Sequence, residues 1–162
     1  MQKTAHPGTP DDSADQAGAV FRLIYRSHSK IAEADCDHVL GEILRVARAN
    51  NAAQGITGAL MLYSGWFSQV LEGEEAKIRK LFAVIKADAR HGSVQLTEEA
   101  NVPRRAFARW AMANVGEHGH PDVPLVATSE GTTEGAPWRL SDEQESVVLL
   151  LRGLTRGYGI GA

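Results

Sequence analysis

Apolar residues recur with a period of two in several segments between residues 20 and 115, a pattern typical of β-strands with a buried face. The first segment alternates around Phe21, Leu23 and Tyr25. Two further apolar runs fold back through Ser64-Gly65, which predicts a β-hairpin. The predicted strands cover residues 20–26, 56–63, 66–72, 94–96 and 109–115.

Two longer segments follow the helical period instead. Residues 35–49 begin with acidic side chains, carry apolar residues at helical spacing and end at Asn50-Asn51. Residues 74–89 carry a second apolar stripe. The resulting order predicts an α+β fold: a ferredoxin-like βαββαββ sheet with two helices on one face, plus a C-terminal helical extension.

The C-terminal extension has its own start signal. Ser141 and Gln144 have the spacing of a capping box, which predicts a short helix that runs to about Arg152 and is stopped by Gly153. Its apolar band, residues 147–151, is too rich for an isolated helix in water. Two interpretations stay open: the helix covers the open face of the sheet, or residues 140–154 form an interface with a copy of the chain or a partner.

Composition divides the 162 residues into four parts. Residues 1–18 are rich in Gly, Pro, Asp, Ser and Thr, which predicts a disordered tail. Residues 19–116 hold the core, residues 117–137 form a Gly/Pro-rich linker, and residues 138–162 form the helical extension. We therefore expect one folded domain with appendages.

Charge and cysteine content narrow the function classes. The formal net charge is −3, so no basic excess favours a nucleic acid partner. A single cysteine, the lack of an apolar signal core and the lack of a membrane-length apolar stretch favour a reducing, cytoplasmic location without membrane attachment.

Gln69 is the polar exception in the predicted hairpin, because its neighbours are apolar. Burying a primary amide without partners costs about 1–3 kcal/mol or more. Side chains two apart on a strand share a face, so Gln69 faces the helices if Phe67 and Leu71 do. By the same parity Trp110 and Met112 share a face. Together with Gln69 and Tyr25 they predict a binding surface for a flat, polar-edged ligand between the helices.

Six short motifs between residues 20 and 115 resemble, in order, those of a BLUF domain, a blue-light sensor that uses FAD. Together they are far more specific than any one motif. They are Ile24-Tyr25-Arg26-Ser27, the helix end at residues 47–51, Gly55-Ile56-Thr57-Gly58, Gln69-Val70-Leu71-Glu72-Gly73, Asp88-Ala89-Arg90-His91, and residues 104–107 leading into Trp110-Ala111-Met112.

The resemblance implies that residues 19–116 bind a flavin between the two helices. It makes Tyr25 the photochemical electron donor, places Gln69 between Tyr25 and the flavin, and gives Asn51 a hydrogen bond to the O4/N3 edge of the ring. Positions matched to the flavin lining or to its ribityl-phosphate side are Asn50, Ile85, Asp88, Arg90 and His91. FAD is the expected cofactor, and FMN or riboflavin would also fit because the ring and its edge carry most of the recognised contacts.

By the same resemblance, light moves an electron and a proton from Tyr25 to the flavin, Gln69 rearranges, and a stronger hydrogen bond to O4 shifts the absorption to the red. A rotated or tautomerised amide exchanges its donor and acceptor, so one side chain can be a two-state switch. The state would pass through the last strand, by Trp110 or Met112, to the C-terminal segment and a protein partner. Which of the two lies closer to Gln69 is open.

A sensor without enzymatic turnover is therefore the leading hypothesis, and we expect a homo-oligomer formed through the sheet or a helix. One alternative is a flavoenzyme or a small acylphosphatase-like hydrolase on the same fold, but the sequence offers no nucleophile with an adjacent base, no Gly-rich phosphate loop and no metal-ligand cluster. The other alternative is a ligand-binding module without photochemistry.

Overall fold

The computed structural model describes residues 20–116, 121–122, 125–128, 131–134 and 141–155. The tail predicted at residues 1–18 and much of the predicted linker lie outside these residues. The centre of the fold is a five-stranded sheet with strand order β4-β1-β3-β2-β5. Its strands are β1 (Val20–Ser29), β2 (Thr57–Tyr63), β3 (Trp66–Gly73), β4 (His91–Val102) and β5 (Ala113–Val115).

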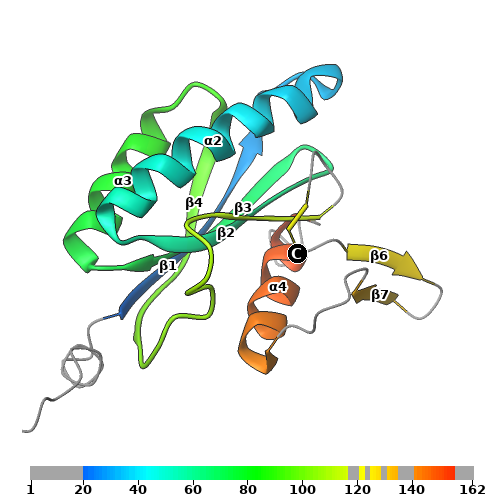
Figure 1. Cartoon of the computed structure of the whole chain (residues 1–162). Coiled ribbons are helices and arrows are strands. Elements are labelled where there is room, and N and C mark those ends of the chain that lie inside the picture. Colours follow the sequence, from blue (N-terminus) through cyan, green and yellow to red (C-terminus); the bar gives the residue numbers. More distant parts are fainter. Residues whose placement is uncertain (1–19, 117–120, 123–124, 129–130, 135–140, 156–162) are drawn as a thin grey trace, which may run out of the picture.

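Helices cover both faces of this sheet. A 3-10 turn, η1 (Glu33–Asp35), leads into α2 (Cys36–Gln54), which lies with α3 (Glu75–Ala87) on one face, while α4 (Asp142–Thr155) lies on the other (Figure 1). β1 pairs antiparallel with β3 and β4, β2 pairs antiparallel with β3, and β5 runs parallel to β2. The predicted α+β, ferredoxin-like architecture with two helices on one face is confirmed.

The central strands are buried on both sides, which explains their dense apolar sequences. Phe21, Leu23 and Tyr25 of β1 pack in the core under α2 and α3, while Ile24 between them packs in the core under α4. The same alternation in β3 sends Gln69 toward the α2/α3 face and Glu72 toward the α4 face. The sheet therefore connects the α2/α3 face, which carries Gln69, with the α4 face, which carries Glu72.

Helix α2 does not end at Asn50-Asn51 as predicted. It continues to Gln54 and ends where Gly55 adopts the left-handed conformation at φ 65°. Gly55 has no Cβ, so this conformation carries no steric cost, and it is a stronger stop than the two asparagines. Asn51 therefore lies in the last turn of the helix, where its side chain is buried toward the sheet.

The final predicted strand was also wrong in extent, because only Ala113–Val115 is β5. Residues 109–112 lie before the strand, so the period of two does not apply to them. Met112 packs in the core under α2 and α3, whereas Trp110 packs against the core under α4. The expectation that these two side chains share a face is wrong.

The C-terminal helix begins as predicted, with reciprocal capping bonds from the Ser141 backbone N–H to Gln144 Oε1 (2.9 Å) and from the Gln144 backbone N–H to Ser141 Oγ (3.1 Å). It runs through Gly153 to Thr155, past its predicted stop. A Gly in a helix interior costs only about 1 kcal/mol relative to Ala. The burial of Leu151 and Leu154 on either side of Gly153 offsets that cost.

Helix α4 buries one face on the sheet and leaves Leu149 and Leu150 exposed. It therefore covers the sheet, as the first interpretation expected. Part of the predicted linker forms a hairpin of β6 (Leu125–Thr128) and β7 (Gly131–Glu134). Within the described residues, every helix is too short or too polar to span a membrane.

Candidate functional site

Gln69 is the centre of the site, and its amide has a different partner at each end. Its carbonyl oxygen accepts a hydrogen bond from the Tyr25 hydroxyl, and its Nε2 donates to the sulfur of Met112 at 3.3 Å. Tyr25 and Gln69 are direct partners in the β1–β3 register, so the sheet itself sets their contact. The polar demand of the buried amide is met, but on the donor side only by a weak thioether acceptor.

Tyr25 is held as a neutral phenol. Its side chain is buried among the rings of Phe82, with centroids 5.4 Å apart, and His91, with centroids 6.1 Å apart. Burial raises the pKa of the phenol, and the negative charge of Asp88 raises it further. Tyr25 therefore keeps its proton and can donate it in a hydrogen bond to Gln69.

A groove between α2 and α3 opens onto this pair. Its walls are apolar side chains of the two helices, and its floor is polar. Val46 and Val84 are 46% and 62% exposed, so large apolar surfaces stand uncovered along it. The lining residues are Tyr25, Ile43, Val46, Ala47, Asn50, Asn51, Leu60, Gln69, Leu81, Val84, Ile85, Asp88, Arg90 and His91.

At one end of the groove, α2 holds the segment that carries Met112. Asn51 Nδ2 donates to the carbonyl of Ala111 at 2.9 Å, and Arg48 Nε donates to the carbonyl of Met112 at 3.0 Å. The bond to Ala111 fixes the amide plane of Asn51 and uses one of its two N–H hydrogens. Asn50, by contrast, is exposed at the rim of the groove.

At the groove's other end, the residues that follow α3 form a charged cluster. Arg90 Nε donates to Asp88 Oδ1 at 3.0 Å, and the hydrogen bond from this guanidinium is the main cause that lowers the pKa of Asp88 to about 2. His91 Nδ1 lies 2.7 Å from the hydroxyl oxygen of buried Ser27. Burial lowers the pKa of His91, so its ring is neutral near pH 7.

Most of the predicted site residues come together in one place. The sulfur of Met112 contacts the Gln69 amide, whereas Trp110 does not line the groove, and its ring centroid lies 6.2 Å from that of Phe107. Sequence reasoning missed the groove walls formed by Val46 and Val84. These two valines lie at helical spacing from partly buried apolar residues of their helices. Such spacing does not distinguish a helix face that packs on protein from a face that stays exposed. The predicted site residues that line the groove are Tyr25, Asn50, Asn51, Gln69, Ile85, Asp88, Arg90 and His91.

Comparison with protein families gives one match over the domain. The BLUF model, described as "Sensors of blue-light using FAD", matches residues 20–113. Among curated proteins, the chain is 34% identical over 141 residues to the photoactivated adenylate cyclase subunit beta of Euglena gracilis, covering 85% of this chain and 16% of that protein. It is 28% identical over 114 residues to the blue light- and temperature-regulated antirepressor BluF of Escherichia coli (strain K12), covering 69% of this chain and 28% of that protein. The chain thus spans a small part of these relatives.

Solved structures agree with the sequence match. The dark-state structure of BlrB, described as a BLUF protein, is 32% identical with a TM-score of 0.55, and the match covers 59% of this chain and 71% of that chain. The photo-activated state of BlsA is 33% identical with a TM-score of 0.57, covering 59% of this chain and 68% of that chain.

The groove fits the flavin that the family description names. A flavin ring is flat, with two apolar faces and one polar edge. The uncovered Val46 and Val84 and the flanking Ile85 suit the faces, while the amides of Asn51 and Gln69 suit the edge. Arg90, whose side chain is 43% exposed beside the opening, suits a phosphate.

Proposed function

Because the chain belongs to the BLUF family of blue-light sensors that use FAD, we propose that it binds a flavin between α2 and α3 and signals light through Gln69. The observation that carries this proposal is the contact sequence from the Tyr25 hydroxyl to the Gln69 amide to the Met112 sulfur at the floor of an apolar groove. When bound, the flavin supplies the absorption of blue light and an acceptor for one electron.

Several side chains would hold the flavin. Asn51 would bind the O4/N3 edge of the ring with its remaining N–H and its carbonyl, and Ile85 would pack against a face of the ring. The chain carries Asn50 at the rim and Asp88, Arg90 and His91 toward the side that would receive the ribityl-phosphate. Most of these contacts concern the ring and its polar edge, which FAD, FMN and riboflavin share, so FMN or riboflavin would also fit.

Tyr25 is the electron and proton donor in this proposal. After excitation its phenol would give one electron and its hydroxyl proton to the flavin and would regain both at the end of the cycle, so that no net oxidation would occur. The hydrogen bond to Gln69 supports this role because it provides a path for the proton. The raised pKa of Tyr25 also supports it, since a phenol that is protonated at rest has a proton to give.

Gln69 is the switch. Once the phenol had lost its proton, the Gln69 carbonyl would lose the donor that faces it, and the amide would rotate or tautomerise and donate a stronger hydrogen bond to the flavin O4. The weak Met112 contact supports such a rearrangement, because breaking a bond to a thioether costs less than breaking one to an oxygen.

The signal would leave through residues 110–112. Met112 faces Gln69 while Trp110 packs on the α4 side, so one short segment reaches both faces of the sheet. We propose that output passes from there to α4 and to a protein partner or a second copy of the chain, in the cytoplasm and without substrate turnover. The alternative is a flavin-binding module, or a small enzyme of this fold, without photosignalling.

The test uses the full chain reconstituted with FAD. We expect a yellow protein that quenches flavin fluorescence and whose visible absorption shifts to the red under blue light and returns in darkness. A protein that takes up no FAD contradicts the proposal. A yellow protein whose spectrum never shifts reversibly leaves only the flavin-binding alternative.

A further inference from the structure

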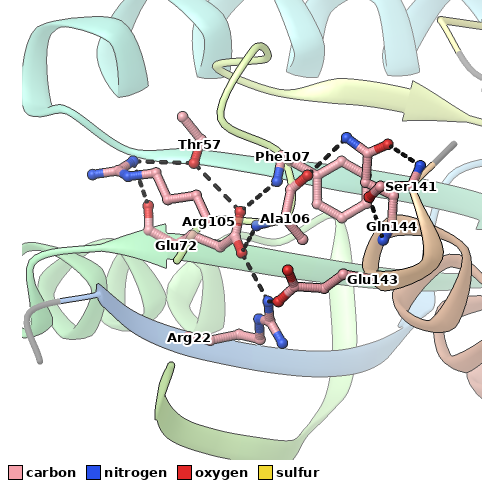
Figure 2. Close-up of polar contacts among 9 residues, drawn as sticks. All are labelled: Arg22, Thr57, Glu72, Arg105, Ala106, Phe107, Ser141, Glu143 and Gln144. Carbon is pink, nitrogen blue, oxygen red and sulfur yellow. Dashed lines mark hydrogen bonds and ion pairs between the residues drawn. The ribbon is translucent and has the colours of Figure 1, made fainter. Parts of the chain in front are cut away.

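The carboxylate of Glu72 is fully buried where the sheet meets the loop of residues 103–112 (Figure 2). It accepts hydrogen bonds from the backbone N–H groups of Ala106 at 2.7 Å and Phe107 at 2.8 Å. Arg22, opposite it on β1, lies 3.2 Å from it and balances its charge. A buried charge with these partners holds the loop in one position.

The first turn of α4 joins the same cluster. Glu143 forms an ion pair with Arg22 at 2.9 Å, through the same Nη2 that pairs with Glu72 (Figure 2). Gln144 Nε2 donates to the carbonyl of Ala106 at 2.8 Å. The residue whose N–H is fixed by Glu72 thus has its carbonyl fixed by α4 (Figure 2). We call Arg22, Glu72, Ala106, Phe107, Glu143 and Gln144 the Glu72 junction.

The loop held by this junction leads directly to the floor of the groove. Trp110 donates its N–H to the carbonyl of Phe107 at 3.0 Å and accepts from the N–H of Gly58 at 3.1 Å. Two residues later, Met112 contacts Gln69. No more than five residues therefore separate the junction from the sulfur that accepts from the proposed switch, and Phe107 and Trp110 are already hydrogen-bonded across that interval.

We propose that the Glu72 junction couples α4 to the Gln69–Met112 contact, with Glu72, Glu143 and Gln144 acting as positioning residues. This inference rests on the proposed function and names the route of its regulation. Coupling between two sites is reciprocal: if a change at Gln69 loosens the junction, then loosening the junction from α4 changes the balance at Gln69. A change at Gln69 in the light therefore alters the contacts of α4, and the contacts of α4 in turn affect how long the light state lasts.

Two variants at half-buried positions in the first turn of α4 loosen the junction without touching the groove. Glu143→Gln removes the charge that pairs with Arg22, and Gln144→Ala removes the donor to Ala106. Glu145→Gln is the matched control for the first, because it removes a charge from the same helix turn. Ser141→Ala is the control for the second, because Gln144 also belongs to the capping box that Ser141 forms.

In the dark, we expect hydrogen exchange at the Ala106 and Phe107 amides to be faster in Glu143→Gln and Gln144→Ala by about five-fold or more, the lower range of typical coupling. The controls should exchange like the wild type. In the FAD-loaded full chain, the same two variants should change the rate of dark recovery by a similar factor, and blue light should raise exchange at residues 106–107 in the wild type.

If hydrogen exchange at residues 106–107 is unchanged in both variants, α4 does not hold the loop through the Glu72 junction. The same conclusion follows if exchange is equally faster in the controls. If both variants show a normal red shift and recover in darkness at the wild-type rate, the proposed coupling is wrong while the proposed function stands. A wild type without a red shift contradicts the proposed function instead, and dark exchange then decides on the junction alone.

Discussion

Replacing Tyr25 by Phe is expected to abolish the reversible red shift of the flavin absorption while leaving flavin binding in place. Phenylalanine fills the same buried space between Phe82 and His91, so the groove keeps its shape. It has no hydroxyl proton to give and no hydrogen bond to donate to Gln69. The measurement is the light-minus-dark absorption difference of the FAD-loaded variant.

The matched control is Tyr63→Phe, which removes the hydroxyl of a tyrosine that is 41% exposed at the end of β2. Its red shift should equal that of the wild type. A Tyr25→Phe protein that still shifts reversibly would show that the electron and proton come from another residue.

Replacing Gln69 by Leu is expected to remove the same red shift by a different cause. Tyr25 remains to donate an electron, but no amide can form the new hydrogen bond to O4. The Tyr25 hydroxyl also loses its acceptor in a buried position, which we expect to cost about 1–3 kcal/mol in the free energy of unfolding. The light-minus-dark spectrum and a urea unfolding curve measure the two effects.

Gln54→Leu provides the control, since it makes the same chemical change at an exposed position at the end of α2. It should keep both the spectral shift and the wild-type stability within about 0.5 kcal/mol. Retention of the full red shift in Gln69→Leu would remove Gln69 from the switch.

The sequence predicted the floor of the groove well because strand parity is a strong constraint. Gln69 lies between Phe67 and Leu71 on a buried strand, and a period of two leaves one face for all three. The family resemblance implied that Gln69 lies beside Tyr25, and the pairing of β1 with β3 that makes the contact is known from the structure. Local periodicity was sufficient wherever the backbone was a regular strand.

Parity failed where the backbone was irregular. Residues 109–112 lie before β5, so their side chains follow the loop that Glu72 holds rather than the pleat of a strand. That is why Met112 reaches Gln69 and Trp110 does not. The predicted helix end at Asn50-Asn51 was wrong for a similar local reason, because the helix continues until Gly55 adopts the left-handed conformation.

The Glu72 junction could not be predicted from sequence patterns. Glu72 stands at the end of a strand, where a carboxylate commonly faces water. Its partners come from residues 22, 106 and 107, and the Arg22 bridge leads on to residue 143, so the contacts join parts of the chain up to 121 positions apart. Only the three-dimensional arrangement of β1, β3, the loop and α4 brings them together.

The most direct test of the central claim is a light-minus-dark infrared difference spectrum of the FAD-loaded full chain. A stronger hydrogen bond weakens a carbonyl, so we predict that the flavin C4=O stretch moves to lower frequency under blue light, returns in darkness, and does not move in Gln69→Leu. A wild-type protein whose C4=O stretch stays in place while its flavin absorbs blue light would contradict Gln69 as the light-driven hydrogen-bond switch.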